Sequence, residues 1–207
     1  MSAPQTQTTP RDPLARPVLG HVNLMADTLI ANATLDDLRA IVRSMVASAT
    51  PGVAAALTAA ARDRLAQTHM RTSSGSGTAQ PPSGALFTPH GVPTTQLHDV
   101  LRRARALYGS GMGFASLGLL ACAVRATVGL RWERDGATAD ILAVIDADIG
   151  QAIQSCKEEA DAGRAVGDRR GLHELRGAVA ASAADVAAWG GEFPFERAAA
   201  SLEFWNA

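Results

Sequence analysis

The chain has 207 residues, of which 19 are Lys or Arg and 20 are Asp or Glu, so its formal net charge is −1 at pH 7. Hydrophobic residues make up 47% and aromatic residues only 4%, which predicts a buried core built mainly from Leu, Val, Ile and Ala. A net charge so close to zero creates no overall field that would attract nucleic acid or an anionic membrane, and neither is expected as a partner.

The first 17 residues are rich in Pro, Thr and Gln and lack the cationic and apolar segments of a secretory signal. We predict a disordered tail over residues 1–17. Cys122 and Cys156 have neither the CxxC spacing of a redox site nor a zinc-ligand pattern. They are therefore expected to be reduced, buried thiols in a cytoplasmic or nuclear protein.

Residues 18–67 are predicted to form a unit of three helices joined by short turns. In the second helix, within "TLDDLRAIVRSMV", Thr34 and Asp37 have the spacing of a capping box. Apolar residues then recur three and four positions apart, and residues with that spacing share one face of a helix. We call this set the N-terminal stripe: Leu35, Leu38, Val42 and Met45.

Residues 68–93 consist largely of Ser, Gly, Pro and Thr, and they are predicted to be a flexible linker. Residues 94–207 return to helical periodicity, most clearly in "TADILAVIDADIGQAIQSCKEEADAG". No run of residues has the pattern of a strand. The expected fold is all-α, with a helical bundle of about five helices over 94–207 preceded by the three-helix unit on its linker.

The stretch "LYGSGMGFASLG" has glycines at alternate positions, Gly109, Gly111 and Gly113. A dinucleotide-binding loop needs a strand directly before it, and a P-loop needs Gly-Lys-Ser or Gly-Lys-Thr. Neither is present, so no cofactor is predicted. We expect a helix to end here with Gly109 or Gly111 in a left-handed conformation.

Asp146 and Asp148 form a D-x-D pair, a spacing found in metal-dependent glycosyl transfer. Residues two apart on a helix point in different directions, so they do not readily share a cation. We predict solvated or paired carboxylates, with Asp148 close enough to the apolar face to meet an arginine of a neighbouring helix. The five histidines are scattered, and no catalytic or metal-ligating residue is assigned.

Several arginines between positions 102 and 134 would form a basic patch if they gathered on one surface. Acidic residues outnumber basic ones over 94–207, whereas a nucleic-acid site usually has an excess of basic residues together with aromatic stacking platforms. Solvated faces and ion pairs are therefore favoured over a nucleic-acid site. The arginines concerned are Arg102, Arg103, Arg105, Arg125, Arg131 and Arg134.

Aromatic residues concentrate at the C-terminus, in "WGGEFPFERAAASLEFW". Large aromatic side chains of this kind dominate the energetics of both cores and protein interfaces. The favoured interpretation is a terminal helix that folds back and completes the bundle core. In the alternative, Phe193, Phe195 and Trp205 are anchors for a protein partner.

Three segments, "VRATVGLRWE", "DADIGQAIQSCKEE" and "WGGEFPFERA", resemble a group of uncharacterised helical proteins of filamentous fungi over residues 94–207. The resemblance implies an intracellular eukaryotic protein. It implies no activity, cofactor or site residue.

Two functions follow from these patterns. The leading hypothesis is a non-enzymatic helical adaptor or scaffold that binds protein partners through the N-terminal stripe and the C-terminal aromatics. The alternative is a helical enzyme or small-molecule-binding protein. Its pocket would lie between helices 114–128 and 138–162, with Arg125, Asp148 and Cys156 as its polar groups.

Overall fold

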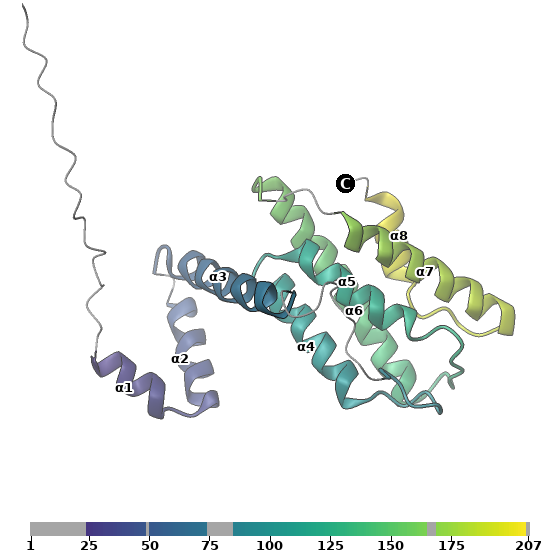
Figure 1. Cartoon of the computed structure of the whole chain (residues 1–207), viewed down its shortest axis with the longest axis horizontal. Coiled ribbons are helices and arrows are strands. Elements are labelled where there is room, and N and C mark those ends of the chain that lie inside the picture. Colours follow the sequence, from purple (N-terminus) through teal and green to yellow (C-terminus); the bar gives the residue numbers. More distant parts are fainter. Residues whose placement is uncertain (1–23, 49, 74–84, 165–168, 206–207) are drawn as a thin grey trace, which may run out of the picture. The chain divides into compact units, whose positions relative to one another are not determined.

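The structure, a computed structural model, describes four stretches of the chain: 24–48, 50–73, 85–164 and 169–205. Within these stretches the chain forms eight α-helices, and its only extended pairing is an isolated antiparallel bridge between Phe87 and Pro93 (Figure 1). The predicted all-α class is confirmed. The predicted tail over 1–17 lies outside the described residues.

The chain divides into two units, Met1–Val53 and Ala54–Ala207. The described part of the first unit holds helices α1 (Leu24–Asn32) and α2 (Leu35–Ala47). The third helix, α3 (Val53–Ser73), begins at the end of the first unit and lies otherwise in the second.

The boundary between the units thus falls earlier than the end of the predicted three-helix segment at residue 67. One reason is a hydrogen bond inside the second unit, in which Arg62 of α3 donates to the backbone carbonyl of Ser110 at 3.1 Å.

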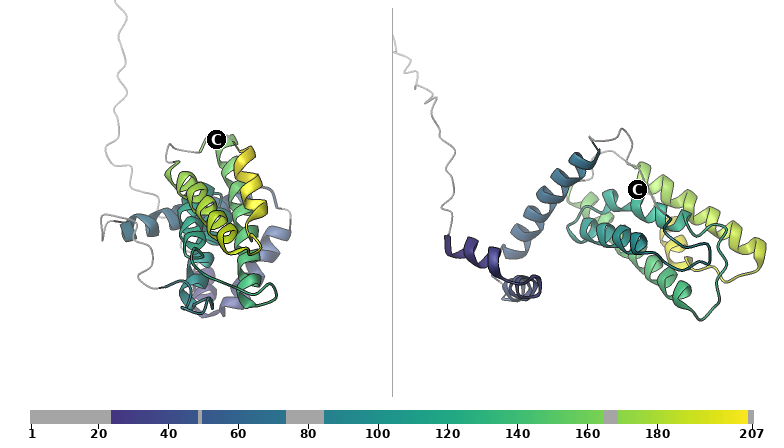
Figure 2. Two further views of the ribbon diagram at one scale, coloured as in Figure 1. Left: turned by 90° about the vertical axis from the view of Figure 1, so that its right-hand side faces the viewer. Right: turned by 60° about the horizontal axis from the view of Figure 1, so that its bottom comes forward.

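The rest of the second unit is a bundle of five helices, as predicted: α4 (Thr95–Gly109), α5 (Gly113–Arg125), α6 (Ala137–Asp161), α7 (Arg170–Trp189) and α8 (Glu196–Phe204). Helix α5 packs against α4, α6 and α7, and the short α8 lies on α6 and α7 (Figure 2). Because α5 touches three neighbours, it is apolar on most of its circumference. Its described residues include seven that are buried.

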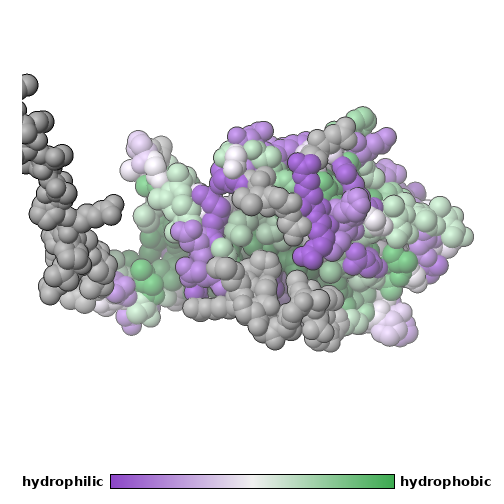
Figure 3. Space-filling view, turned by 45° about the horizontal axis from the view of Figure 1, so that its top comes forward, coloured by the Kyte–Doolittle hydropathy of each residue, from purple (hydrophilic) through white to green (hydrophobic). Residues whose placement is uncertain are grey.

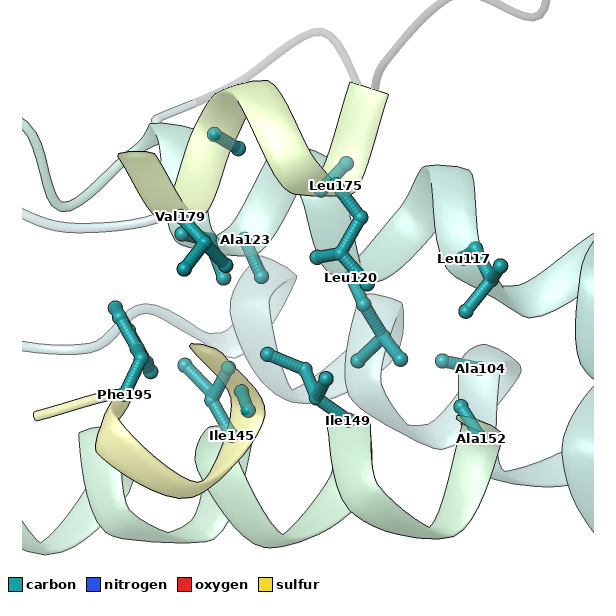
Figure 4. Close-up of a cluster of buried hydrophobic side chains, with 14 of the residues drawn as sticks. Ala104, Leu117, Leu120, Ala123, Ile145, Ile149, Ala152, Leu175, Val179 and Phe195 are labelled. Atoms are coloured by element: carbon teal, nitrogen blue, oxygen red, sulfur yellow. The ribbon is translucent and has the colours of Figure 1, made fainter. Parts of the chain in front are cut away.

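Apolar side chains from these helices meet in one core, drawn in Figure 4. Leu117 and Leu120 of α5, Ile145 and Ile149 of α6, and Leu175 of α7 are all fully or almost fully removed from solvent. Burying one such side chain stabilises a folded chain by about 1.5–3 kcal/mol. This core is the main source of stability of the second unit.

The segment predicted as a linker, 68–93, is shorter than expected. Helix α3 continues to Ser73, and from residue 85 the chain packs against the bundle with Leu86 and Phe87 buried in its core. The apolar pair Leu86 and Phe87 anchors the segment in the core. The two ends of the segment are also joined, because the hydroxyl of Thr94 donates to the carbonyls of Ala85 and Leu86. Residues 74–84 lie outside the described part of the chain.

The glycine stretch is a helix end followed by a tight turn. Gly111 has a φ of 77°, a left-handed conformation that glycine adopts without steric cost. Its N–H donates to the carbonyl of Tyr108, and the N–H of Met112 donates to the carbonyl of Leu107, both at 3.0 Å. These two bonds define a Schellman motif, so the predicted left-handed helix end is confirmed at Gly111.

Candidate interaction surface

Helix α2 begins where its sequence predicts. The hydroxyl oxygen of Thr34 accepts a hydrogen bond from the backbone N–H of Asp37 at 3.1 Å, and the hydroxyl donates to the Asp37 carboxylate at 2.6 Å. Asp36 and Asp37 also lie in the first turn, where negative charge interacts favourably with the helix dipole. The cap therefore fixes where α2 begins, and the spacing of three and four residues places the N-terminal stripe on one face of the helix.

The N-terminal stripe faces solvent. Leu35 is 62% exposed and Met45 is 53% exposed, Val42 is also exposed, and Leu38 is half-buried. No residue of α2 is buried. The structure therefore brings the four predicted residues onto one mostly exposed face of α2.

The exposed apolar residues of α1 and α2 form what we call the N-terminal apolar surface: Leu29, Ile30, Leu35, Ile41, Val42, Met45 and Val46. The much longer second unit exposes only five large apolar side chains among its described residues. On the face of the molecule drawn in Figure 3, hydrophilic residues are interspersed with hydrophobic ones. Exposed apolar groups so concentrated in two short helices are typical of interaction sites.

The C-terminal aromatics lie mostly inside the bundle. Phe195 is completely buried and Trp205 is 8% exposed. The ring centroids of Trp205 and Phe114 are 5.8 Å apart, and the Arg176 guanidinium donates a hydrogen bond to the backbone carbonyl of Trp205. Neither Phe195 nor Trp205 is presented to a partner in this structure, because both rings pack inside the bundle core. The positions of both residues agree with the interpretation in which the terminal helix folds back and completes the bundle core.

Phe193 differs from these two residues. It is half-buried, with its ring edge-to-face against Phe195 at 5.9 Å between centroids. It also lines a pocket of about 290 Å³ on α7 and α8. The other lining residues are Arg176, Val179, Ala180, Ala183, Ala199, Leu202 and Glu203.

Both carboxylates of the D-x-D pair are buried and paired. Asp148 accepts hydrogen bonds from the Arg105 guanidinium and the Tyr108 hydroxyl, each at 2.8 Å at the shortest. Asp146 accepts from Arg197 and from the backbone N–H of Ala198, both at 2.8 Å. The predicted pairing of Asp148 with an arginine of a neighbouring helix is confirmed. Asp146 holds the N-terminus of α8, a role that the local sequence did not reveal.

The three polar residues of the alternative pocket do not converge. Asp148 faces α4 through its bonds to Arg105 and Tyr108, whereas Arg125 is exposed at the end of α5. Cys156 is buried where α5 and α6 meet.

The helices leave no room at that meeting point. A Cβ atom on Gly113 would lie 2.4 Å from the backbone nitrogen of Cys156, so the backbones of α5 and α6 touch there. Burial raises the pKa of the Cys156 thiol to about 12. The thiol is therefore protonated at neutral pH, and a protonated thiol is a poor nucleophile.

The arginines between 102 and 134 are largely engaged with carboxylates. Four of them form ion pairs with N–O distances of 2.6–3.0 Å: Arg102–Asp99, Arg105–Asp148, Arg131–Asp185 and Arg134–Glu192. A backbone hydrogen bond from Gly129, followed by the contact with Arg131, lowers the pKa of the Asp185 carboxyl. Each pairing removes positive charge from the surface that a polyanion would need.

Over the described stretches, no three His, Cys, Asp or Glu side chains come together in a way that would hold a metal ion. In the same stretches, no helix combines the length and the apolar character needed to cross a membrane.

The fold and the surface together define an all-α protein with a well-packed helical bundle and an open apolar surface on two further helices. Comparisons with protein-family models, with curated proteins and with solved structures find no match.

Proposed function

We propose that this chain is a non-enzymatic helical adaptor or scaffold that binds a protein through the N-terminal apolar surface. The observation that carries the proposal is the exposure of seven large apolar side chains on α1 and α2, in which no described residue is buried. The second unit is the folded framework, since the apolar faces of its helices are buried together in its core.

The physical basis is the instability of an uncovered short helix. Helix α2 has 13 residues, and isolated helices shorter than about 12–15 residues are marginal in water even with favourable sequences. Such helices gain their stability by packing an apolar face against another surface. Apolar residues three and four positions apart are the anchors that an amphipathic helix inserts into a protein groove.

Phe193 gives the second unit an apolar recess of its own, in the pocket on α7 and α8. A scaffold engages partners at more than one surface, and this pocket accommodates an apolar side chain of a bound protein. Phe193 therefore remains a proposed partner-binding residue, on a different unit from the N-terminal stripe.

A matched pair of variants tests the proposal. Val42 in α2 and Val144 in α6 are both 38% exposed, so Val42→Asp and Val144→Asp add the same charge to equally accessible sites. We expect the Val144→Asp chain to retain the proteins that copurify with the wild type, and the Val42→Asp chain to lose at least one stoichiometric partner. Circular dichroism must show that both variants are folded. Identical sets of copurifying proteins would contradict the proposal.

A further inference from the structure

The pocket on α7 and α8 is a groove between two antiparallel helices, which we call the α7–α8 groove. Arg176, near the start of α7, donates to the backbone carbonyls of Leu202 and Trp205 at the end of α8, so the two helices run in opposite directions. One face of each helix lines the groove. The lining residues are Arg176, Val179, Ala180 and Ala183 on α7 and Ala199, Leu202 and Glu203 on α8.

The two ends of the α7–α8 groove differ in their chemistry. One end holds Arg176 and Glu203, because the last residues of α8 lie beside Arg176. Ala183 lies about 10 Å further along α7, at a rise of 1.5 Å per residue. Phe193 lines the groove from the connection between the two helices. The groove is therefore charged at one end and apolar at the other.

The guanidinium of Arg176 has no carboxylate partner within the described stretches. Its bonds to the two carbonyls both use Nη2, which leaves Nε and Nη1 as donors. Although Arg176 and Glu203 line the same groove, neither forms an ion pair with the other or with a further described residue. Arg176 is half-buried, and a charge partly removed from water is stabilised by an oppositely charged partner. The charged end therefore favours an anionic group.

The size and the openness of the groove favour one residue of a longer chain over a free small molecule. Its volume is about 290 Å³, whereas pockets that enclose a small molecule have about 300–1,000 Å³ and bury most of its surface. Ala180 and Glu203 are exposed and Phe193 is only half-buried, so one side of the groove is open to solvent. A terminal residue places its side chain in such a groove while the rest of its chain continues outside.

A C-terminal residue with an apolar side chain supplies the groups that both ends of the groove need. Its carboxylate accepts charge-assisted hydrogen bonds from a guanidinium, and its side chain covers the apolar end. Its backbone N–H is a donor for Glu203, whose exposed charge is screened by water and salt. An N-terminal ammonium would pair with Glu203 instead, but it would leave the half-buried Arg176 without an anion.

We propose that the α7–α8 groove binds the C-terminal residue of a partner protein, with its carboxylate on Arg176 and its apolar side chain towards Phe193. This inference rests on the proposed function, in which the same pocket receives an apolar side chain of a bound protein. It names the kind of residue that enters.

The first test titrates the isotope-labelled full chain with short peptides and follows the backbone amide signals by NMR. The probe is acetyl-Gly-Gly-Leu with a free carboxyl group, and the controls are its C-terminal amide and acetyl-Gly-Gly-Gly. We expect the probe to shift signals of α7 and α8. We expect both controls to bind at least about tenfold more weakly, because each lacks one of the two recognised groups. Absence of probe binding would overturn the proposal, as would equal dissociation constants for the probe and its amide.

Free leucine is the control for a small-molecule site. It has the carboxylate and the side chain of the probe but no preceding chain, and its ammonium group replaces the peptide N–H beside Glu203. We expect free leucine to bind more weakly than the probe. Tighter binding of free leucine would overturn the proposal that the occupant is the end of a protein.

Two matched pairs of variants test the location of the site. Arg176→Gln removes the positive charge from the groove, and Arg170→Gln removes one from the same helix outside it. Ala180→Leu fills part of the groove from an exposed position, whereas Ala181→Leu adds the same side chain at an exposed position outside it. We expect the two groove variants to bind the probe at least about tenfold more weakly than the wild type, and the two outside variants to match it.

Circular dichroism shows whether each variant is folded. Because Ala180 is exposed, Ala180→Leu decides the outcome even if Arg176→Gln does not fold. An unchanged dissociation constant in a folded groove variant would overturn the proposal.

The two proposals fail in different ways. If the probe does not bind while Val42→Asp still loses a copurifying protein, the C-terminal-residue inference is overturned and the adaptor function stands. If the probe binds at α7 and α8 while Val42→Asp loses nothing, the N-terminal apolar surface is not the binding site and the α7–α8 groove remains one.

Discussion

Helices α2 and α6 are both amphipathic, yet their apolar faces have opposite environments. In α6 the face that contains Ile145, Ile149 and Ala152 is buried by α4, α5 and α8. In α2 the corresponding face has no buried residue. The difference shows that a periodic apolar pattern predicts an amphipathic helix, but it does not specify whether the rest of the chain buries the apolar face of that helix.

Among the variants that test this comparison, we expect Phe195→Ala to cause the largest loss of stability. Removing a fully buried phenylalanine ring leaves a cavity among α6, α7 and α8, and it lowers the free energy of unfolding of the second unit by about 3–5 kcal/mol. Urea unfolding followed by circular dichroism measures the change. Phe204→Ala is the control, because Phe204 is 84% exposed and its loss costs less than about 0.5 kcal/mol. Equal losses in the two variants would contradict the described packing of Phe195.

A smaller effect is expected for Gly113→Ala. The new Cβ would lie 2.4 Å from the backbone nitrogen of Cys156, so α5 and α6 must move apart, at a cost of about 1–3 kcal/mol. Gly177→Ala in α7 is the control, since a Cβ there meets no atom within 4 Å and alanine favours the helix by up to about 1 kcal/mol. If both variants are equally stable, the backbones are not in contact at Gly113.

The third prediction uses the single tyrosine of the chain. Burial, followed by the hydrogen bond to Asp148, raises the pKa of Tyr108 from 10.0 to about 12. Because the folded state holds the proton more tightly, this contribution to stability is complete below pH 10 and is lost as the pH rises from 10 through about 12.

The ultraviolet absorbance of tyrosinate follows this titration directly. We expect a midpoint near 12 in the folded chain and near 10 in denaturant. Asp148→Asn lowers the midpoint of the folded chain, because it removes the negative charge that opposes ionisation of Tyr108. A folded-state midpoint equal to that in denaturant would contradict the described contact.

The smallest effect is expected in α2. Leu35→Ala and Met45→Ala each change the free energy of unfolding of the second unit by less than about 0.5 kcal/mol, measured by urea unfolding of dilute protein. The reason is that both side chains are mostly exposed and touch no buried core. A loss of about 2 kcal/mol or more is typical of truncation in a core. It would mean that the apolar face of α2 is buried, as that of α6 is.

Local chemistry determined much of this structure. The Thr34 cap of α2, the left-handed Gly111 at the end of α4 and the periodic apolar face of α6 were all predicted, because each depends on residues within one or two helical turns. The same reasoning placed the N-terminal stripe on one face of a helix. It also predicted the pairing of Asp148, since a carboxylate beside an apolar face needs a partner.

Tertiary packing decided what local patterns leave open. The contact of Gly113 with Cys156, the burial of Leu86 and Phe87, and the capping of α8 by Asp146 all join residues that are distant in the sequence. The aromatic rings of Phe195 and Trp205 suit a core and an interface equally well as isolated residues. Only the arrangement of the bundle assigned them to the core, because burial depends on which surfaces meet. A local sequence pattern does not specify contacts with residues that are distant in the sequence.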